Sequence, residues 1–237
     1  TTLFRSLLSN NFAYWGSTHS TLDPTSVGAG NRYVFSTSGN ITITTTNASK
    51  TYGDAIDLST SYSLSGLPLN AATYGNVFTN ASSSDVFSVS PSITSSGSST
   101  TASVLGGAYA ISASGATANN GFTLVYANTG LLSVTPKALT ITTPIISNKV
   151  YDTTTAATIS NTLTINQSDF VGTQTVTATA SATFANKNVG NAKTVTVVYT
   201  LTDGSNGGLA SNYSLANSSV TADITKADLA VSGLTAS

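Results

Sequence analysis

The chain carries the same short pattern twice, at a spacing of roughly a hundred residues. Each copy places a lysine two residues before a tyrosine, in Lys50-Thr51-Tyr52-Gly53-Asp54 and in Lys149-Val150-Tyr151-Asp152. The repeats also close on similar exits, Val134-Thr135-Pro136-Lys137 and Ile224-Thr225-Lys226. A tandem repeat of this length is typical of an array of domains, so it predicts two consecutive modules.

The composition favours strands over helices. Charged residues make up 7% of the chain, against about 25% in an ordinary globular protein. Thr, Ser, Val, Tyr, Asn and Gly are abundant, and these residues favour strands and turns. Glu is absent and Lys, Arg and Gln are scarce, although these are the usual residues of a helix surface. The hydrophobic content of 40% argues against a disordered Ser/Thr-rich stalk, so the sequence predicts an all-β fold.

Several functional classes find no support in the sequence. The net charge of −1 gives no electrostatic footprint for nucleic acid. No stretch reaches the about 20 apolar residues that a membrane-spanning helix needs. The chain has no cysteine, no glutamate and a single histidine, so it offers no pattern for catalysis, a metal or a cofactor. We therefore expect a protein that is not an enzyme, does not insert into membranes and binds no cofactor.

Four segments follow from the repeat boundaries. Residues 1–38 form an aromatic adaptor, 39–135 and 136–226 form the two β modules, and 227–237 begin a further repeat. The modules are predicted to be β-sandwich-like, and a β-grasp-like arrangement is the alternative that the sequence leaves open. We expect a monomeric, elongated rod that belongs to a longer chain.

Individual strands can be placed by their alternation. Residues 174–184 alternate apolar and Thr/Ser side chains, which predicts a strand with one buried face, and 193–201 predict a second long strand. Residues 103–105 also suggest a strand. Residues 122–126 and 131–134 predict a hairpin closed by the loop at 127–130.

The motifs of both repeats resemble known bacterial surface modules. The second repeat is similar to the YDG module in its runs 149–156, 184–190 and 211–215. The first repeat resembles the sister MBG module of YGX type in residues 50–54, 109–113 and 125–134. Two departures stand out: Thr153 occupies a usual glycine position, and Asn120-Gly121-Phe122 replaces the usual Asn-Tyr pair late in the first repeat, which could alter a surface aromatic. The turn at Thr153 is therefore expected to be built differently.

Modules of this kind occur in filamentous-haemagglutinin-like adhesins that two-partner secretion exports. The resemblance implies a structural stalk segment of a secreted surface adhesin, which mediates cell adhesion or biofilm attachment by projecting a binding region. It implies a location at the bacterial cell surface and an outer-membrane transporter as partner during export. The absence of cysteine suits export of an unfolded chain. The alternative function is an adhesive module that itself binds a host glycan or surface protein.

Two groups of residues are candidates for function. The first could stack on a glycan, although its members could equally form the adaptor's own core: Tyr14, Trp15 and Tyr33. The second defines the repeat and is interpreted as structural, with buried tyrosines whose hydroxyls satisfy backbone groups and with polar turn residues. Its members are Lys50, Tyr52, Gly53, Asp54, Lys149, Tyr151, Asp152, Asn212 and Tyr213.

Overall fold

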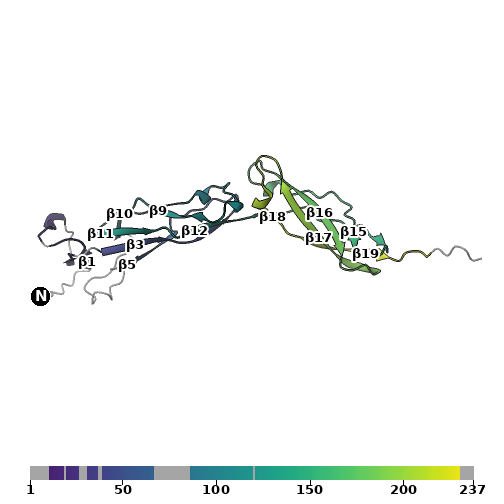
Figure 1. Cartoon of the computed structure of the whole chain (residues 1–237), viewed down its shortest axis with the longest axis horizontal. Coiled ribbons are helices and arrows are strands. Elements are labelled where there is room, and N and C mark those ends of the chain that lie inside the picture. Colours follow the sequence, from purple (N-terminus) through teal and green to yellow (C-terminus); the bar gives the residue numbers. More distant parts are fainter. Residues whose placement is uncertain are drawn as a thin grey trace, which may run out of the picture. The chain divides into compact units, whose positions relative to one another are not determined.

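The computed structural model describes residues 11–18, 20–26, 31–36, 39–66, 86–119 and 121–229 of the chain. These residues confirm the all-β prediction, because many short strands dominate them and the named helices are 3₁₀ turns of three residues (Figure 1). A β-grasp arrangement packs a helix on its sheet, and the described residues contain no helix long enough for that role. In the same part of the chain, no helix has the length and apolar character needed to cross a membrane.

The chain divides into two compact units. Unit 1 contains Thr1–Lys50, Asp54–Ala102 and Gly106–Val134. Unit 2 contains Thr135–Ser237 and two short earlier segments, Thr51–Gly53 and Ser103–Leu105. The two short segments complete unit 2, although they precede it in the chain.

Unit 1 is assembled from small sheets. The strand orders are β1-β2, β11-β3-β5, β4-β12-β8, β7-β9 and β10-β6. Their bounds are β1 Asn11–Tyr14, β2 Asn31–Val34, β3 Gly39–Thr45, β4 Ala48–Thr51, β5 Tyr62–Gly66, β6 Phe87–Val89, β7 Ser92–Thr94, β8 Tyr109–Ala110, β9 Ser112–Ser114, β10 Thr117–Ala118, β11 Phe122–Ala127 and β12 Leu131–Thr135. The short helices are η1 Pro24–Ser26, η3 Ser96–Ser98 and η4 Val104–Gly106, the last of which belongs largely to unit 2.

The core of unit 1 lies against β3, whose residues alternate between buried and more exposed positions. Ile41 and Ile43 are fully buried and pack with Trp15, Phe122 and neighbouring apolar side chains. A second, smaller cluster contains Leu58, Ile111 and Leu132. Trp15 comes from the predicted adaptor, so this segment contributes to the core of the first repeat.

The predicted hairpin of residues 122–126 and 131–134 is wrong. β11 pairs in parallel with β3, whereas β12 lies in another sheet beside β4 and β8. The loop between them is held by the buried side chain of Thr45, whose Oγ1 accepts from the Gly130 amide at 2.8 Å and donates to the Ile111 carbonyl at 3.1 Å. This tertiary network overrides the local turn signal.

Unit 2 contains one larger sheet. Its strand order is β14-β19-β17-β16-β15, and a separate pair joins β13 to β18. The bounds are β13 Lys137–Leu139, β14 Lys149–Val150, β15 Ala156–Ala157, β16 Val176–Phe184, β17 Gly190–Asp203, β18 Tyr213–Leu215 and β19 Ser218–Thr225, with 3₁₀ turns η5 Gln167–Asp169 and η6 Ala210–Asn212.

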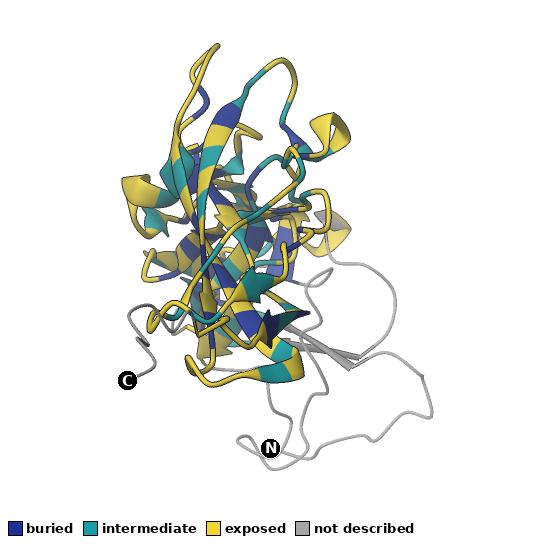
Figure 2. Ribbon diagram, turned by 90° about the vertical axis from the view of Figure 1, so that its right-hand side faces the viewer, coloured by how far each residue is buried: buried dark blue, intermediate teal, exposed yellow. Residues whose placement is uncertain are grey.

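The long strands of unit 2 confirm the alternation predicted from the sequence. β16 and β17 pair antiparallel from Val176 opposite Asp203 to Phe184 opposite Val195. Phe184 and Val195 are buried, while Thr side chains occupy the exposed face, so buried and exposed residues alternate along the strands (Figure 2). The strand predicted at residues 103–105 is wrong, because Val104–Gly106 forms the 3₁₀ turn η4 and Ser103 belongs to no strand.

Candidate functional site

The first copy of the repeated motif is built around a buried lysine. Lys50 is 7% exposed, and its Nζ donates to the Asp54 carbonyl at 3.1 Å and to the Ser98 carbonyl at 3.4 Å. The Ser99 carbonyl is a further acceptor. Burial lowers the pKa of the Lys50 ammonium, and the nearby Asp54 carboxylate partly offsets this effect. The side chain therefore ties the motif to the distant loop at 98–99.

The second copy repeats this device with different acceptors. Lys149 Nζ donates to the Asp152 carboxylate at 2.7 Å, to the Thr154 carbonyl at 2.9 Å and to the Ala156 carbonyl at 3.0 Å. The pair with Asp152 is the one ion pair among the residues that the structure describes. Lys149 thus closes its own turn, whereas Lys50 reaches another loop.

A backbone bond places both motifs at the exit of their repeat. The Tyr52 amide donates to the Thr135 carbonyl at 2.8 Å, and the Tyr151 amide donates to the Thr225 carbonyl at 2.9 Å. Thr135 and Thr225 end the last strands of the two repeats. The recurrence of this bond gives a physical reason why the motif and the exit repeat together.

The turn at Thr153 keeps a glycine-like conformation. Thr153 has φ 69°, while Gly53 in the first motif has φ 91°. Thr153 therefore adopts the positive φ that usually favours glycine. The Asp152 carboxylate holds the turn by accepting from the Thr154 amide at 2.9 Å, although a β-branched residue is strained there.

Replacing Thr153 with glycine is expected to raise the free energy of unfolding of unit 2 by about 1 kcal/mol, because glycine adopts positive φ without the Cβ clash. Urea denaturation followed by far-UV circular dichroism would measure the change. Thr158→Gly is the matched control, because Thr158 does not have positive φ, and this variant should gain nothing. An equal gain in both variants would contradict the strain at Thr153.

The Asp152 carboxylate should make stability depend on pH in the acid range. The bond from Lys149, followed by the bonds from Thr154, lowers the pKa of Asp152 from 3.8 to about 2. A carboxyl with a depressed folded pKa stabilises the fold above its unfolded pKa and loses that contribution as pH falls through its folded pKa. Asp152→Asn should therefore be less stable than the parent chain at neutral pH and should converge with it near pH 2. Denaturation curves at both pH values would test this, and a constant difference would contradict it.

Two of the repeat-defining tyrosines, Tyr52 and Tyr213, meet in a buried cluster of unit 2, whereas Tyr151 is half-buried and packs on the core around Phe184. The hydroxyls of Tyr52 and Tyr213 donate to Gln174 Oε1 at 3.0 and 2.8 Å. The two tyrosine rings lie edge to face with centroids 5.5 Å apart, and Phe170 packs on Tyr213 at 5.8 Å. Burial raises the pKa of Tyr213, which keeps its hydroxyl protonated as a donor. The sequence predicted buried tyrosines but assigned them backbone partners, whereas the Tyr52 acceptor is the side chain of Gln174.

Asn212 fixes another short segment of unit 2. The side chain is 2% exposed, and its Oδ1 accepts from the Val104 amide at 2.9 Å and from Ser103 Oγ at 3.0 Å. Gly53 also approaches this unit closely, because a Cβ at its position would lie 2.5 Å from Val171 Cγ2. The motif residues of the second repeat therefore hold the segments Thr51–Gly53 and Ser103–Leu105 in unit 2.

The predicted aromatic ligand group is not assembled on the surface. Trp15 is 1% exposed and stacks on Phe35 with centroids 4.5 Å apart, so neither face of its indole is open to a ligand. Tyr14 is half-buried. Tyr33 belongs to β2, and its side chain lies outside the described residues. Phe122 occupies the position where a surface aromatic was expected. Its side chain is also buried and stacks on Trp15, with ring centroids 6.3 Å apart.

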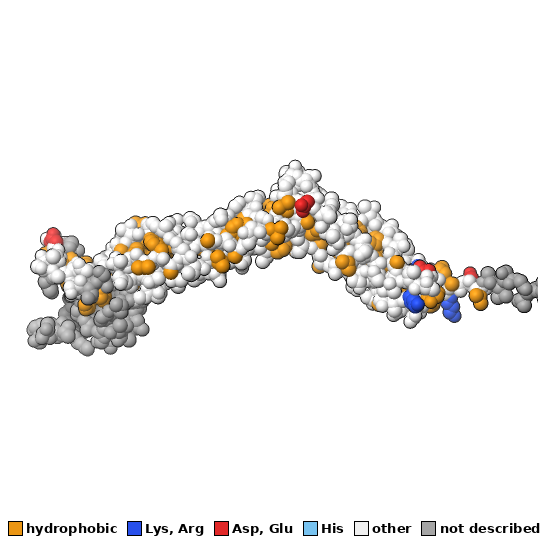
Figure 3. All heavy atoms as spheres, in the orientation of Figure 1, with side chains coloured by type: hydrophobic (Ala, Val, Ile, Leu, Met, Phe, Trp, Pro, Cys, Tyr) orange, Lys and Arg blue, Asp and Glu red, His pale blue; other side chains and the backbone are white. Residues whose placement is uncertain are grey.

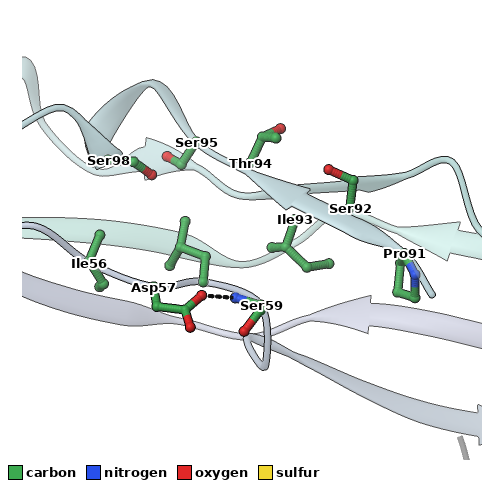
Figure 4. A pocket seen from close by; sticks show the side chains of 10 residues that line it. Ile56, Asp57, Ser59, Pro91, Ser92, Ile93, Thr94, Ser95 and Ser98 are labelled. Atoms are coloured by element: carbon green, nitrogen blue, oxygen red, sulfur yellow. Dashed lines mark hydrogen bonds between the residues drawn. The ribbon is translucent and has the colours of Figure 1, made fainter.

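A groove that the sequence did not reveal opens on unit 1. Residues 56–59 line one wall, and residues 91–95 with Ser98 line the other (Figure 4). Its volume is about 480 Å³. The groove contains hydroxyls and aliphatic side chains but a single charge, the Asp57 carboxylate. No short motif covers both walls, because segments more than thirty residues apart in the first repeat form them.

The surface carries few charged side chains. One face of the molecule shows only scattered acidic and basic groups among uncharged ones (Figure 3). Within the described ranges, no three His, Cys, Asp or Glu side chains are grouped so that they could hold a metal ion. The candidate sites are therefore the hydrogen-bonded motif turns and the groove.

Comparison with known proteins finds a family match for one part of the chain. No curated protein and no solved structure matches the chain significantly. Residues 135–222 match the YDG domain family. This segment lies within unit 2 and contains the Lys149 turn, Gln174, Asn212 and Tyr213. The match to the YDG domain family therefore covers most of unit 2.

Proposed function

We propose that the chain is a structural stalk segment of a secreted bacterial surface adhesin and that it transmits tension between a binding region and the cell. The observation that carries this proposal is the parallel pairing of an early strand with a late strand in each unit. β3 pairs in parallel with β11 in unit 1, while β13 pairs with β18 and β14 with β19 in unit 2.

This pairing determines how a pulling force would act on the hydrogen bonds. Two parallel strands start at the same end, so a chain that enters along the first and leaves along the second is pulled from opposite ends of the pair. The force then runs along the strands and loads their hydrogen bonds together. An antiparallel pair that is opened from its free end loses its bonds one at a time.

Further features of the two units support the same role. Lys50 and Lys149 each bind several carbonyl groups and thereby brace the turns that follow β4 and β14. The resemblance of the first repeat to MBG modules supports an array of surface domains. Export through an outer-membrane transporter is part of the proposal, and the absence of cysteine is compatible with it.

Single-molecule force measurements on the full chain would test the proposal. Because the chain has no cysteine, handles can be attached at single engineered thiols. In the first variant, force would be applied through a thiol at each end of the chain. In the second, it would be applied through Thr173→Cys and Ser205→Cys, which flank the open end of the β16–β17 pair. We expect a clearly higher unfolding force through the ends. Equal forces in the two geometries would overturn the proposed mechanical role.

A further inference from the structure

The groove of unit 1 runs along a strand with one open edge. β7 pairs antiparallel with β9 from Ser92 opposite Ser114 to Thr94 opposite Ser112. Among the described residues, β9 is the only strand that pairs with β7. The opposite wall, residues 56–59, belongs to an irregular segment and offers no strand to that edge. Backbone groups on the groove side of β7 can therefore bond to an added strand.

The floor of this groove is apolar. Ile93 is half-buried and packs against both core clusters of unit 1, and Leu58 is 4% exposed. Ile56 comes from one wall of the groove and Ile93 from the other (Figure 4). An extended segment with alternating side chains could place its apolar residues on this floor while its backbone follows β7.

The single charge in the groove has a fixed position. Asp57 Oδ1 accepts from the Ser59 amide at 2.8 Å. The bonds from the backbone and side chain of Ser59 lower the pKa of Asp57, so the group is anionic at neutral pH. No Lys or Arg side chain of the described residues forms an ion pair with it. A cationic side chain of a ligand would supply the missing partner.

We propose that this groove binds an extended peptide segment of a partner protein, which adds a strand to β7 and places a lysine or arginine beside Asp57. A sugar fits the hydroxyl-lined walls less well, because none of the lining residues is aromatic and sugar rings commonly stack on aromatic side chains. The open strand edge and the unpaired carboxylate are the features that an extended basic peptide uses. This site is independent of the mechanical role, since tension is carried by other strands.

Amide chemical shifts of the ¹⁵N-labelled full chain would test the proposal. The probe is the blocked peptide acetyl-Thr-Val-Lys-Val-Thr-amide. We expect it to shift the amide signals of residues 92–94 and 57–59. The same peptide with glutamate in place of lysine should bind about three- to fivefold more weakly, as expected for one partly exposed ion pair.

Two matched controls separate charge from strand addition. Asp57→Asn keeps an oxygen that can accept from Ser59 but removes the charge, so the lysine and glutamate peptides should then bind equally. Methylation of alternate peptide amides removes the donors that strand addition needs, and it should abolish the shifts. The proposal is overturned if the lysine peptide causes no shift in these residues or if the methylated peptide binds as well. It is also overturned if galactose or an N-acetylglucosamine trimer shifts these amides and the peptides do not.

Discussion

Replacing Tyr52 with alanine is expected to lower the free energy of unfolding of unit 2 by about 3–5 kcal/mol, the range observed when a large buried aromatic ring is truncated. Tyr52 is 1% exposed, and its ring packs edge to face on Tyr213. The substitution also removes one of the two hydroxyls that donate to Gln174. The large effect would come from the cavity, with a smaller part from the lost hydrogen bond.

A graded series would separate these two contributions. Tyr52→Phe retains the ring and removes only the hydroxyl, so it should cost about 0.5–1.5 kcal/mol. Val189→Ala is a control within unit 2, because Val189 is exposed and its truncation should change stability by less than about 0.5 kcal/mol. Urea denaturation of the full chain would be followed by far-UV circular dichroism and by the fluorescence of Trp15.

The fluorescence signal reports on unit 1 alone, whereas the circular dichroism signal reports on both units. Trp15 is the only tryptophan and lies in the core of unit 1, whereas circular dichroism follows the strands of both units. Tyr52→Ala should shift the unfolding of unit 2 to lower urea concentration. This shift should be seen by circular dichroism and not in the Trp15 fluorescence. A shift confined to the Trp15 signal would mean that Tyr52 stabilises unit 1 instead, which would contradict its place in unit 2.

The sequence predicted the features that depend on local patterns. Alternation over residues 174–184 identified β16 because one face of that strand is buried and the other is exposed. The repeated lysine and tyrosine identified two equivalent turns, since Tyr52 and Tyr151 make the same backbone bond to the exit of their repeat. Such features follow from the order of side chains along a short stretch of chain.

Features that depend on distant partners could not be derived in this way. The stretch 122–134 has the composition of a hairpin, but the parallel pairing of β11 with β3 decides its place. The partnership of Tyr52 with Gln174 joins residues 122 positions apart, and Gln174 belongs to no motif. The groove is equally hidden, because residues 56–59 and 91–95 come together only in the folded unit.

Replacing Trp15 with alanine is expected to lower the free energy of unfolding of unit 1 by about 3–5 kcal/mol. The indole ring stacks on Phe35 and Phe122 and belongs to the cluster around Ile41 and Ile43. The surrounding backbone is shaped for it, because a Cβ at Gly39 would lie 2.9 Å from the Trp15 ring. The segment that precedes the first repeat is thus expected to be part of the folded core.

Because Trp15→Ala removes the fluorophore, its unfolding must be followed by circular dichroism. Val125→Ala is the control within unit 1, since Val125 is 47% exposed and should tolerate truncation with little change. Trp15→Phe should retain part of the stability, because a smaller ring still contacts Phe35 and Phe122. If Trp15→Ala proved as stable as Val125→Ala, the segment at 11–35 would not be part of the core, and its aromatics would again be candidates for ligand binding. A loss of the expected size would assign this segment to the fold of unit 1 and leave the groove as the candidate binding site of that unit.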